Sequence, residues 1–181
     1  ILAASTIDGD LTVRNGNSIT DSGIVTVGGN LAATTDDNNG LINLGTLAVD
    51  GTVQLTTNGS GNATVVNDAG LTFAASTVGG NFAATTDANN GVINLGTLAV
   101  DGTVALTTNG SGNATVVNDA GLNFAASTVG GALNATATTG NMTDSGALTI
   151  TGTTTLTTSA NNATIALDTT TNAFTGAVTI T

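Results

Sequence analysis

The chain contains one stretch twice: residues 27–77 read VGGNLAATTDDNNGLINLGTLAVDGTVQLTTNGSGNATVVNDAGLTFAAST, and residues 78–128 repeat it almost without change. The two copies differ at only five pairs of positions, which are Leu31/Phe82, Asp37/Ala88, Leu41/Val92, Gln54/Ala105 and Thr72/Asn123. Repeats of roughly 20 to 50 residues are typical of solenoids, propellers and repeat arrays. The 51-residue repeat therefore predicts a chain built from stacked, similar units.

A shorter signal runs through the copies and beyond them. A β-branched residue, here called the anchor, is followed two residues later by glycine. The signal recurs at Ile7–Gly9, Val27–Gly29, Val49–Gly51, Val78–Gly80, Val100–Gly102, Val129–Gly131 and Ile150–Gly152, and Ile180 would start the next unit. Short intervals, such as Val27 to Val49, mostly alternate with long ones, such as Val49 to Val78. The alternation predicts short and long coils of about 21 and about 29 residues, lengths that are typical of solenoid repeats.

Apolar residues alternate with polar ones after each anchor. Leu31 and Ala33 follow Val27 at four and six residues, and Phe82 and Ala84 follow Val78 in the same way. Period-two alternation is typical of a strand with one buried and one exposed face. Two further strand-like runs follow in each unit, so the pattern predicts three short strands per coil.

These patterns predict an all-β fold, a right-handed parallel β-helix (β-solenoid) of about seven coils. We expect residues 1–181 to form a single β-solenoid segment of a longer repetitive protein. Within it, the repeat covers residues 27–77 and 78–128, and divergent coils cover residues 1–26 and 129–181. A propeller or an immunoglobulin-like sandwich fits less well, because both need larger or aromatic core residues than this chain has.

The composition excludes most catalytic chemistry. The chain has no Cys, His, Trp, Tyr or Pro, a single basic residue (Arg14), and twelve acids, all of them Asp. Zinc, haem and iron–sulfur sites need the thiolates and imidazoles that are absent. The net charge of −11 disfavours nucleic acid, and no apolar run is long enough to span a membrane. We therefore expect no enzyme, no nucleic-acid partner and no membrane insertion by this segment.

The C-terminal coils carry a family resemblance. Residues 146–158 (GALTITGTTTLTT), 162–168 (NATIALD) and 172–181 (NAFTGAVTIT) resemble the coils of large filamentous-haemagglutinin-type adhesins. Those proteins are exported by two-partner secretion or as autotransporter passengers. The resemblance implies a bacterial β-strand repeat exoprotein, located at the cell surface or in a biofilm matrix, with an adhesive or scaffolding role.

Several residues are candidates for specific roles. The anchor glycines Gly9, Gly29, Gly51, Gly80, Gly102, Gly131 and Gly152 would supply either bends with positive φ or close approaches of the backbone. Asn62, Asn113 and Asn162 follow a similar pattern in three units, which suggests a structural Asn stack. Asp8 and Asp10 are the best pair for Ca²⁺, which prefers oxygen ligands. Asp at a turn can equally bond its own backbone, and no other cofactor is expected.

Threonine-rich runs such as Thr151, Thr153, Thr155 and Thr157 suggest the hydroxyl faces of ice-binding solenoids. The unequal coil lengths would disturb such a face, and threonine is also a good strand residue.

The function that fits best is an extracellular fibre, matrix scaffold or adhesin stalk built by stacking of coils. Self-association at the coil ends, at Ile1–Thr6 and Ala177–Thr181, and binding to cell-surface or matrix glycans are the expected partnerships. A glycan- or ice-binding module is the alternative, and a polysaccharide-processing enzyme is a weaker one.

Overall fold

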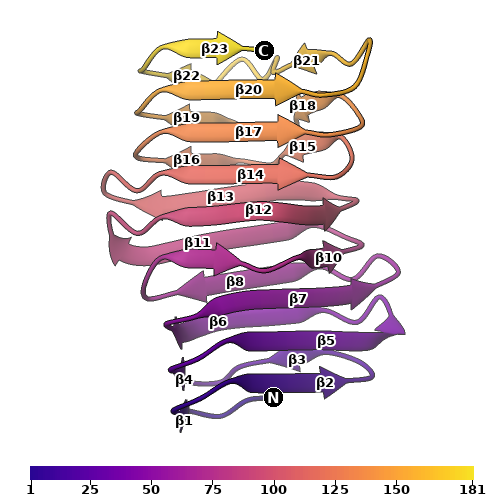
Figure 1. Ribbon diagram of the computed structural model, residues 1–181, viewed down its shortest axis with the longest axis vertical. Coiled ribbons are helices and arrows are strands. Elements are labelled where there is room, and N and C mark those ends of the chain that lie inside the picture. Colours follow the sequence, from indigo (N-terminus) through magenta and orange to yellow (C-terminus); the bar gives the residue numbers. More distant parts are fainter.

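Two parallel sheets face each other in the computed structural model, which describes residues 1–181 (Figure 1). The 13-stranded sheet contains β1 (Ser5–Ile7), β3 (Ile19–Thr20), β4 (Val25–Val27), β6 (Ile42–Val49), β8 (Ala63–Asn67), β11 (Phe82–Asn89), β13 (Thr103–Asn109), β15 (Leu122–Phe124), β16 (Ser127–Val129), β18 (Met142–Asp144), β19 (Leu148–Ile150), β21 (Ile165–Ala166) and β22 (Ala173–Phe174). The 10-stranded sheet contains β2 (Leu11–Asn15), β5 (Leu31–Asn38), β7 (Thr52–Asn58), β9 (Leu71–Phe73), β10 (Ser76–Val78), β12 (Ile93–Val100), β14 (Ala114–Asn118), β17 (Leu133–Ala137), β20 (Thr154–Thr158) and β23 (Val178–Ile180). Every strand pair is parallel, and the structure has no helix.

The chain winds into a solenoid of about eight turns. In Figure 1 it runs from left to right in the nearer sheet and returns from right to left in the fainter, more distant sheet while it climbs, so the winding is right-handed. The predicted all-β parallel β-helix is confirmed. None of its elements is an apolar helix of the kind that crosses a membrane.

One hydrophobic core runs along the whole solenoid between the sheets. Inward residues of each strand stack on inward residues of the next turn: Ile42 pairs with Ala63, Ala63 with Phe82, and Phe82 with Val104. Large and small side chains alternate along this column. The ring of Phe82 also meets Phe73 of the opposite sheet edge to face, with centroids 5.3 Å apart.

The solenoid has about eight turns where the anchors predicted about seven, but the predicted alternation of short and long coils was wrong. Each short anchor interval is one turn, because Val27 pairs with Val49 and Val78 pairs with Val100 across neighbouring strands of one sheet. Each long interval moves the anchor to the other sheet: Val49 lies in the 13-stranded sheet, and the next anchor, Val78, lies in the 10-stranded sheet. A long interval is therefore one and a half turns, and the turns themselves are nearly uniform.

The sequence repeat therefore spans two and a half turns. Its first copy places β5 in the 10-stranded sheet, and the second copy places the equivalent strand, β11, in the 13-stranded sheet. The two copies consequently present the same residues on opposite faces of the rod. This arrangement is possible because strands of both sheets alternate inward and outward residues in the same way. The same stretch of sequence can therefore form a strand of either sheet.

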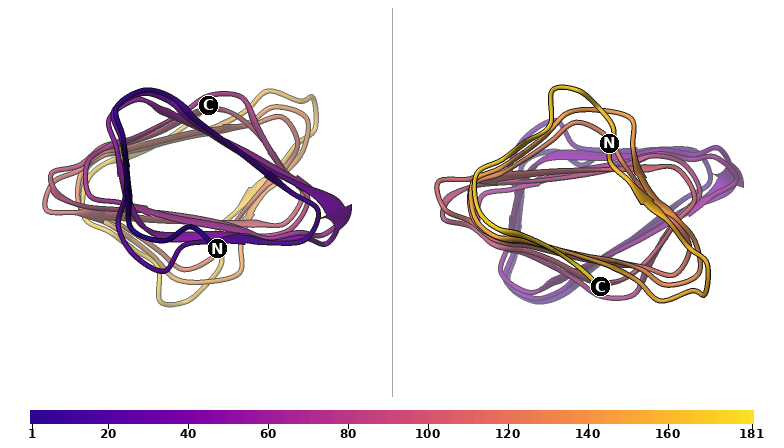
Figure 2. Two further views of the ribbon diagram at one scale, coloured as in Figure 1. Left: turned by 90° about the horizontal axis from the view of Figure 1, so that it is seen from below. Right: turned by 90° about the horizontal axis from the view of Figure 1, so that it is seen from above.

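The prediction of three strands in every coil was also wrong, because the number of strands differs from one turn to the next. Four strands are eight residues long and fill one side of a turn without a break, namely β5, β6, β11 and β12. Other sides are divided into two short strands, as in β9 and β10 or β15 and β16. Viewed along the axis, the coils are closed loops with rounded corners, and the outlines of the two ends of the rod do not superpose (Figure 2).

Candidate functional site

The anchor glycines lie at the turns between the two sheets, where successive coils come close together. A Cβ atom on Gly102 would meet the backbone of Gly80 and the side chain of Asn81 in the turn below. The backbone blocks a side chain in the same way at Gly29, Gly51, Gly80, Gly131 and Gly152, whereas the space around Gly9 in the first coil is open. None of the seven has positive φ, which occurs instead at Gly59, Gly110, Asn39, Asn90 and Asn162. These glycines therefore serve close approach and not an unusual bend.

The structure does not bring Asn62, Asn113 and Asn162 into one stack. Asn62 precedes β8 and Asn113 precedes β14, so the two lie on opposite sheets. The Asn62 side-chain oxygen accepts a hydrogen bond from the Asn81 amide at 2.7 Å, and that of Asn113 accepts one from the Ala132 amide at 2.8 Å. Each of these two side chains thus links one turn to the next, whereas Asn162 adopts positive φ in a turn.

Two buried asparagines, Asn67 and Asn118, were missed by the sequence reasoning. Asn118 is 1% exposed; its side-chain oxygen accepts from the Val100 amide at 2.9 Å, and its nitrogen donates to the carbonyls of Val100 and Gly121. Asn67 makes the equivalent bonds in the first copy. The alternation of inward residues Ala114, Val116 and Asn118 was the available signal, because it places the amide inside.

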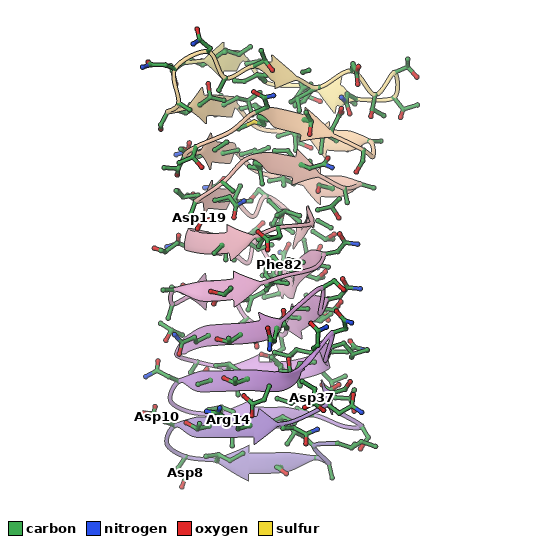
Figure 3. All side chains as sticks on the ribbon, turned by 90° about the vertical axis from the view of Figure 1, so that its right-hand side faces the viewer. Asp8, Asp10, Arg14, Asp37, Phe82 and Asp119 are labelled. Carbon is green, nitrogen blue, oxygen red and sulfur yellow. The ribbon has the colours of Figure 1, made fainter.

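Asp8 and Asp10 lie in the first turns, at one edge of the rod (Figure 3). One carboxylate oxygen of Asp10 accepts a hydrogen bond from the Asn30 amide at 2.7 Å. The chain has no group of three or more acids that could hold a metal ion. The Ca²⁺ site therefore stays a prediction from the sequence, and the observed role of Asp10 is to join two turns.

The chain's single ion pair lies on the surface. The Arg14 guanidinium donates to Asp36 at 2.7 Å, and both side chains are exposed. The hydrogen bond to Asp36, together with its negative charge, raises the pKa of Arg14. Exposed pairs of this kind contribute little to stability.

The threonine run does not form one flat row. Thr155 and Thr157 lie on β20, whereas Thr151 and Thr153 belong to the turn before it. Thr155 continues an outward column that also contains Thr115, Asn134 and Thr179. The members of this column pair on successive strands of one sheet, so the unequal anchor intervals do not interrupt it.

The largest hollow on the surface, with a volume of about 330 Å³, lies where three turns pass from the 10-stranded to the 13-stranded sheet. We call it the corner hollow. It is lined by Val100, Asp101, Gly102, Ala120, Gly121, Leu122, Asn123, Asn141 and Thr143. The side-chain NH₂ group of buried Asn118 donates to the carbonyls of both Val100 and Gly121, and so holds together two of the turns that line the hollow.

A second hollow of about 210 Å³ beside Ile24 carries two carboxylates, Asp68 and Asp87.

Polar groups with free hydrogen-bonding capacity gather in the corner hollow. The side-chain oxygen of Asn123 is buried without a partner, which ordinarily costs roughly 1–3 kcal/mol. Asn141 uses its side-chain oxygen to accept from the Thr164 amide at 2.9 Å, so its NH₂ group stays free. Asp101 and Thr143 line the same space.

The first copy of the repeat has the same corner without this set of polar groups. The Leu71 amide donates to the carbonyl of Val92, as the Leu122 amide donates to that of Asn141, and Thr72 occupies the place of Asn123. Val92 is 47% exposed there. The corner hollow is therefore a feature of the second copy and of the divergent coil that follows it.

Comparison with known proteins identifies the repeat family. The family model described as "Repeats of unknown function (DUF5649)" matches residues 1–37 and 111–181, which is more than half of the chain. The chain belongs to this family. The matched DUF5649 residues include both ends of the solenoid and all of the divergent coils. No curated protein and no solved structure matches the chain.

Proposed function

We propose that this chain is a rigid rod segment of an extracellular bacterial structural protein, a fibre, matrix scaffold or adhesin stalk. The observation that carries the proposal is the unbroken stacking of parallel strands in both sheets around one continuous core. In a solenoid each turn contacts only its neighbours, so stability and length grow together as turns are added. Such a chain is suited to act as a long, rigid spacer.

The chemistry of the side chains favours a non-catalytic role. Catalysis by acids, bases or nucleophiles draws mainly on His, Glu, Lys and Cys, none of which the chain contains. A polysaccharide-processing enzyme on a β-helix would need acidic and basic groups together, and Arg14 is paired with Asp36 in the first turns, away from the corner hollow. The strongly acidic composition likewise disfavours nucleic acid.

The location is proposed from composition and resemblance. The repeat style resembles filamentous-haemagglutinin-type adhesins, and membership of a repeat family fits a long repetitive exoprotein. The coil ends are the proposed self-association surfaces. Val178 and Ile180 of β23 are 46% and 64% exposed at one end, and Ile1 is 90% exposed at the other.

End-to-end association of the 181-residue chain tests the rod proposal. An open strand edge pairs readily with another strand, so we expect concentration-dependent rods of constant width in electron micrographs and sedimentation. Ile180→Lys should suppress them, because it places a charge in the joint. Thr179→Lys, on the outward face of the same strand, is the matched control and should still associate. A monodisperse monomer at every concentration would count against self-assembly through the coil ends.

A further inference from the structure

We propose that the corner hollow is a binding site for a single neutral sugar unit. Its four polar side chains, Asp101, Asn123, Asn141 and Thr143, come from three successive turns, so only the folded solenoid brings them together. The site goes beyond the rod role and does not depend on it: a rod without this site would still be a rod.

The available hydrogen-bonding groups specify the class of ligand. Asp101 and the buried Asn123 oxygen require donors, whereas the free NH₂ group of Asn141 requires an acceptor. A sugar hydroxyl both donates and accepts, so neighbouring hydroxyls of one ring meet both requirements. The Asn123 amide can turn about its last side-chain bond and bring either its oxygen or its nitrogen into the hollow, whereas the Thr164 amide holds the oxygen of Asn141 in place.

The surroundings exclude the other common ligands. No cationic side chain lines the hollow, so an anionic ligand would meet the Asp101 charge without compensation. A bare metal ion is disfavoured, because the hollow supplies one carboxylate and no group of three acids. Val100 and Leu122 also line the hollow, but they are only 2% and 1% exposed, so the polar groups and not apolar contact would have to hold the ring. The lack of an aromatic platform limits the expected affinity to the millimolar range.

The first copy of the repeat supplies a matched control. The double variant Asn123→Thr/Asn141→Val places threonine and valine in the corner hollow. The same two residue types, Thr72 and Val92, already occupy the equivalent corner of the first copy, so the fold accommodates them there. The reverse change, Thr72→Asn with Val92→Asn, supplies both amides to the first corner. Because that corner lies on the opposite sheet junction, a gained site is distinguishable from the original one.

Nuclear magnetic resonance titration tests the proposal with methyl glycosides of glucose, galactose, mannose and N-acetylglucosamine. We expect at least one probe to give saturable shifts at the backbone amides of Gly102, Gly121 and Leu122, which the parent and the variant share, and at the Asn123 and Asn141 side-chain amides of the parent. The Asn123→Thr/Asn141→Val protein should bind at least about tenfold more weakly, since it loses two hydrogen-bonding groups. N-acetylneuraminic acid, which is anionic, should not bind.

Two results would overturn the sugar site. One is the absence of saturable shifts with all four glycosides. The other is an unchanged titration in the double variant, with its amide spectrum otherwise that of the parent, because binding would then lie elsewhere. Neither result touches the rod proposal, which is tested by association.

Discussion

Phe82→Ala is expected to lower the free energy of unfolding by about 3–5 kcal/mol, the range for deleting a buried aromatic ring. Phe82 is 1% exposed and packs edge to face on Phe73 of the opposite sheet. Its neighbours in the column are Ala63 and Val104, which are too small to fill the space. Urea unfolding followed by circular dichroism measures the change.

Phe82→Leu is the matched control, because leucine stands at the equivalent position of the first copy, Leu31. We expect a loss below about 1.5 kcal/mol, since the larger part of the volume is kept. Equal losses for alanine and leucine would mean that the ring does not fill the space between the sheets, and the packing described for this column would be wrong.

Asn118→Ala is expected to cost about 2–4 kcal/mol, because it removes three hydrogen bonds and leaves the amide and carbonyl of Val100 unpaired inside the rod. The loss should appear in urea unfolding and as faster hydrogen exchange at the Val100 amide, which donates to the Asn118 side chain. The corner hollow should also lose its shape, because the turn at Gly121 is held by the same side chain.

Asn134→Ala serves as the control for this prediction. Asn134 lies on the outward face of β17 and is exposed, so its loss should change stability by less than about 0.5 kcal/mol. If Asn118→Ala changed the free energy of unfolding as little as Asn134→Ala, the buried amide would not hold the turns together.

The sequence predicted the fold class because its strongest signal is also the physical cause of the fold. Alternating apolar residues after each anchor, such as Leu31 and Ala33, decide which face of a strand is buried. Stacking of such strands in parallel then requires only that the turns fit, and the glycines at the turns allow it. The lengths of the turns did not follow, because an anchor at Val49 and one at Val78 look alike although they lie on opposite sheets.

The candidate sites were harder to predict for a related reason. A hydrogen bond between turns joins residues one turn apart, and the wrong turn length assigns the wrong partners. Asn62 and Asn113 were expected to stack on each other, whereas each bonds the turn above it. The corner hollow joins Asp101, Asn123 and Asn141, which come together only through the observed register between turns. The sequence alone does not reveal that register.

The repeat of two and a half turns is the central claim, and a spin-label distance between Thr26→Cys and Thr77→Cys tests it most directly. The two residues directly precede the anchors that open the first and second copies, Val27 and Val78, and lie on the outward faces of β4 and β10 in opposite sheets. A sheet separation of about 10 Å and two and a half steps of about 4.8 Å place their backbones at least roughly 15 Å apart. The labels point away from each other, so the measured distance should be longer still. A distance of about 10 Å, as two whole turns on one face would give, would contradict the account.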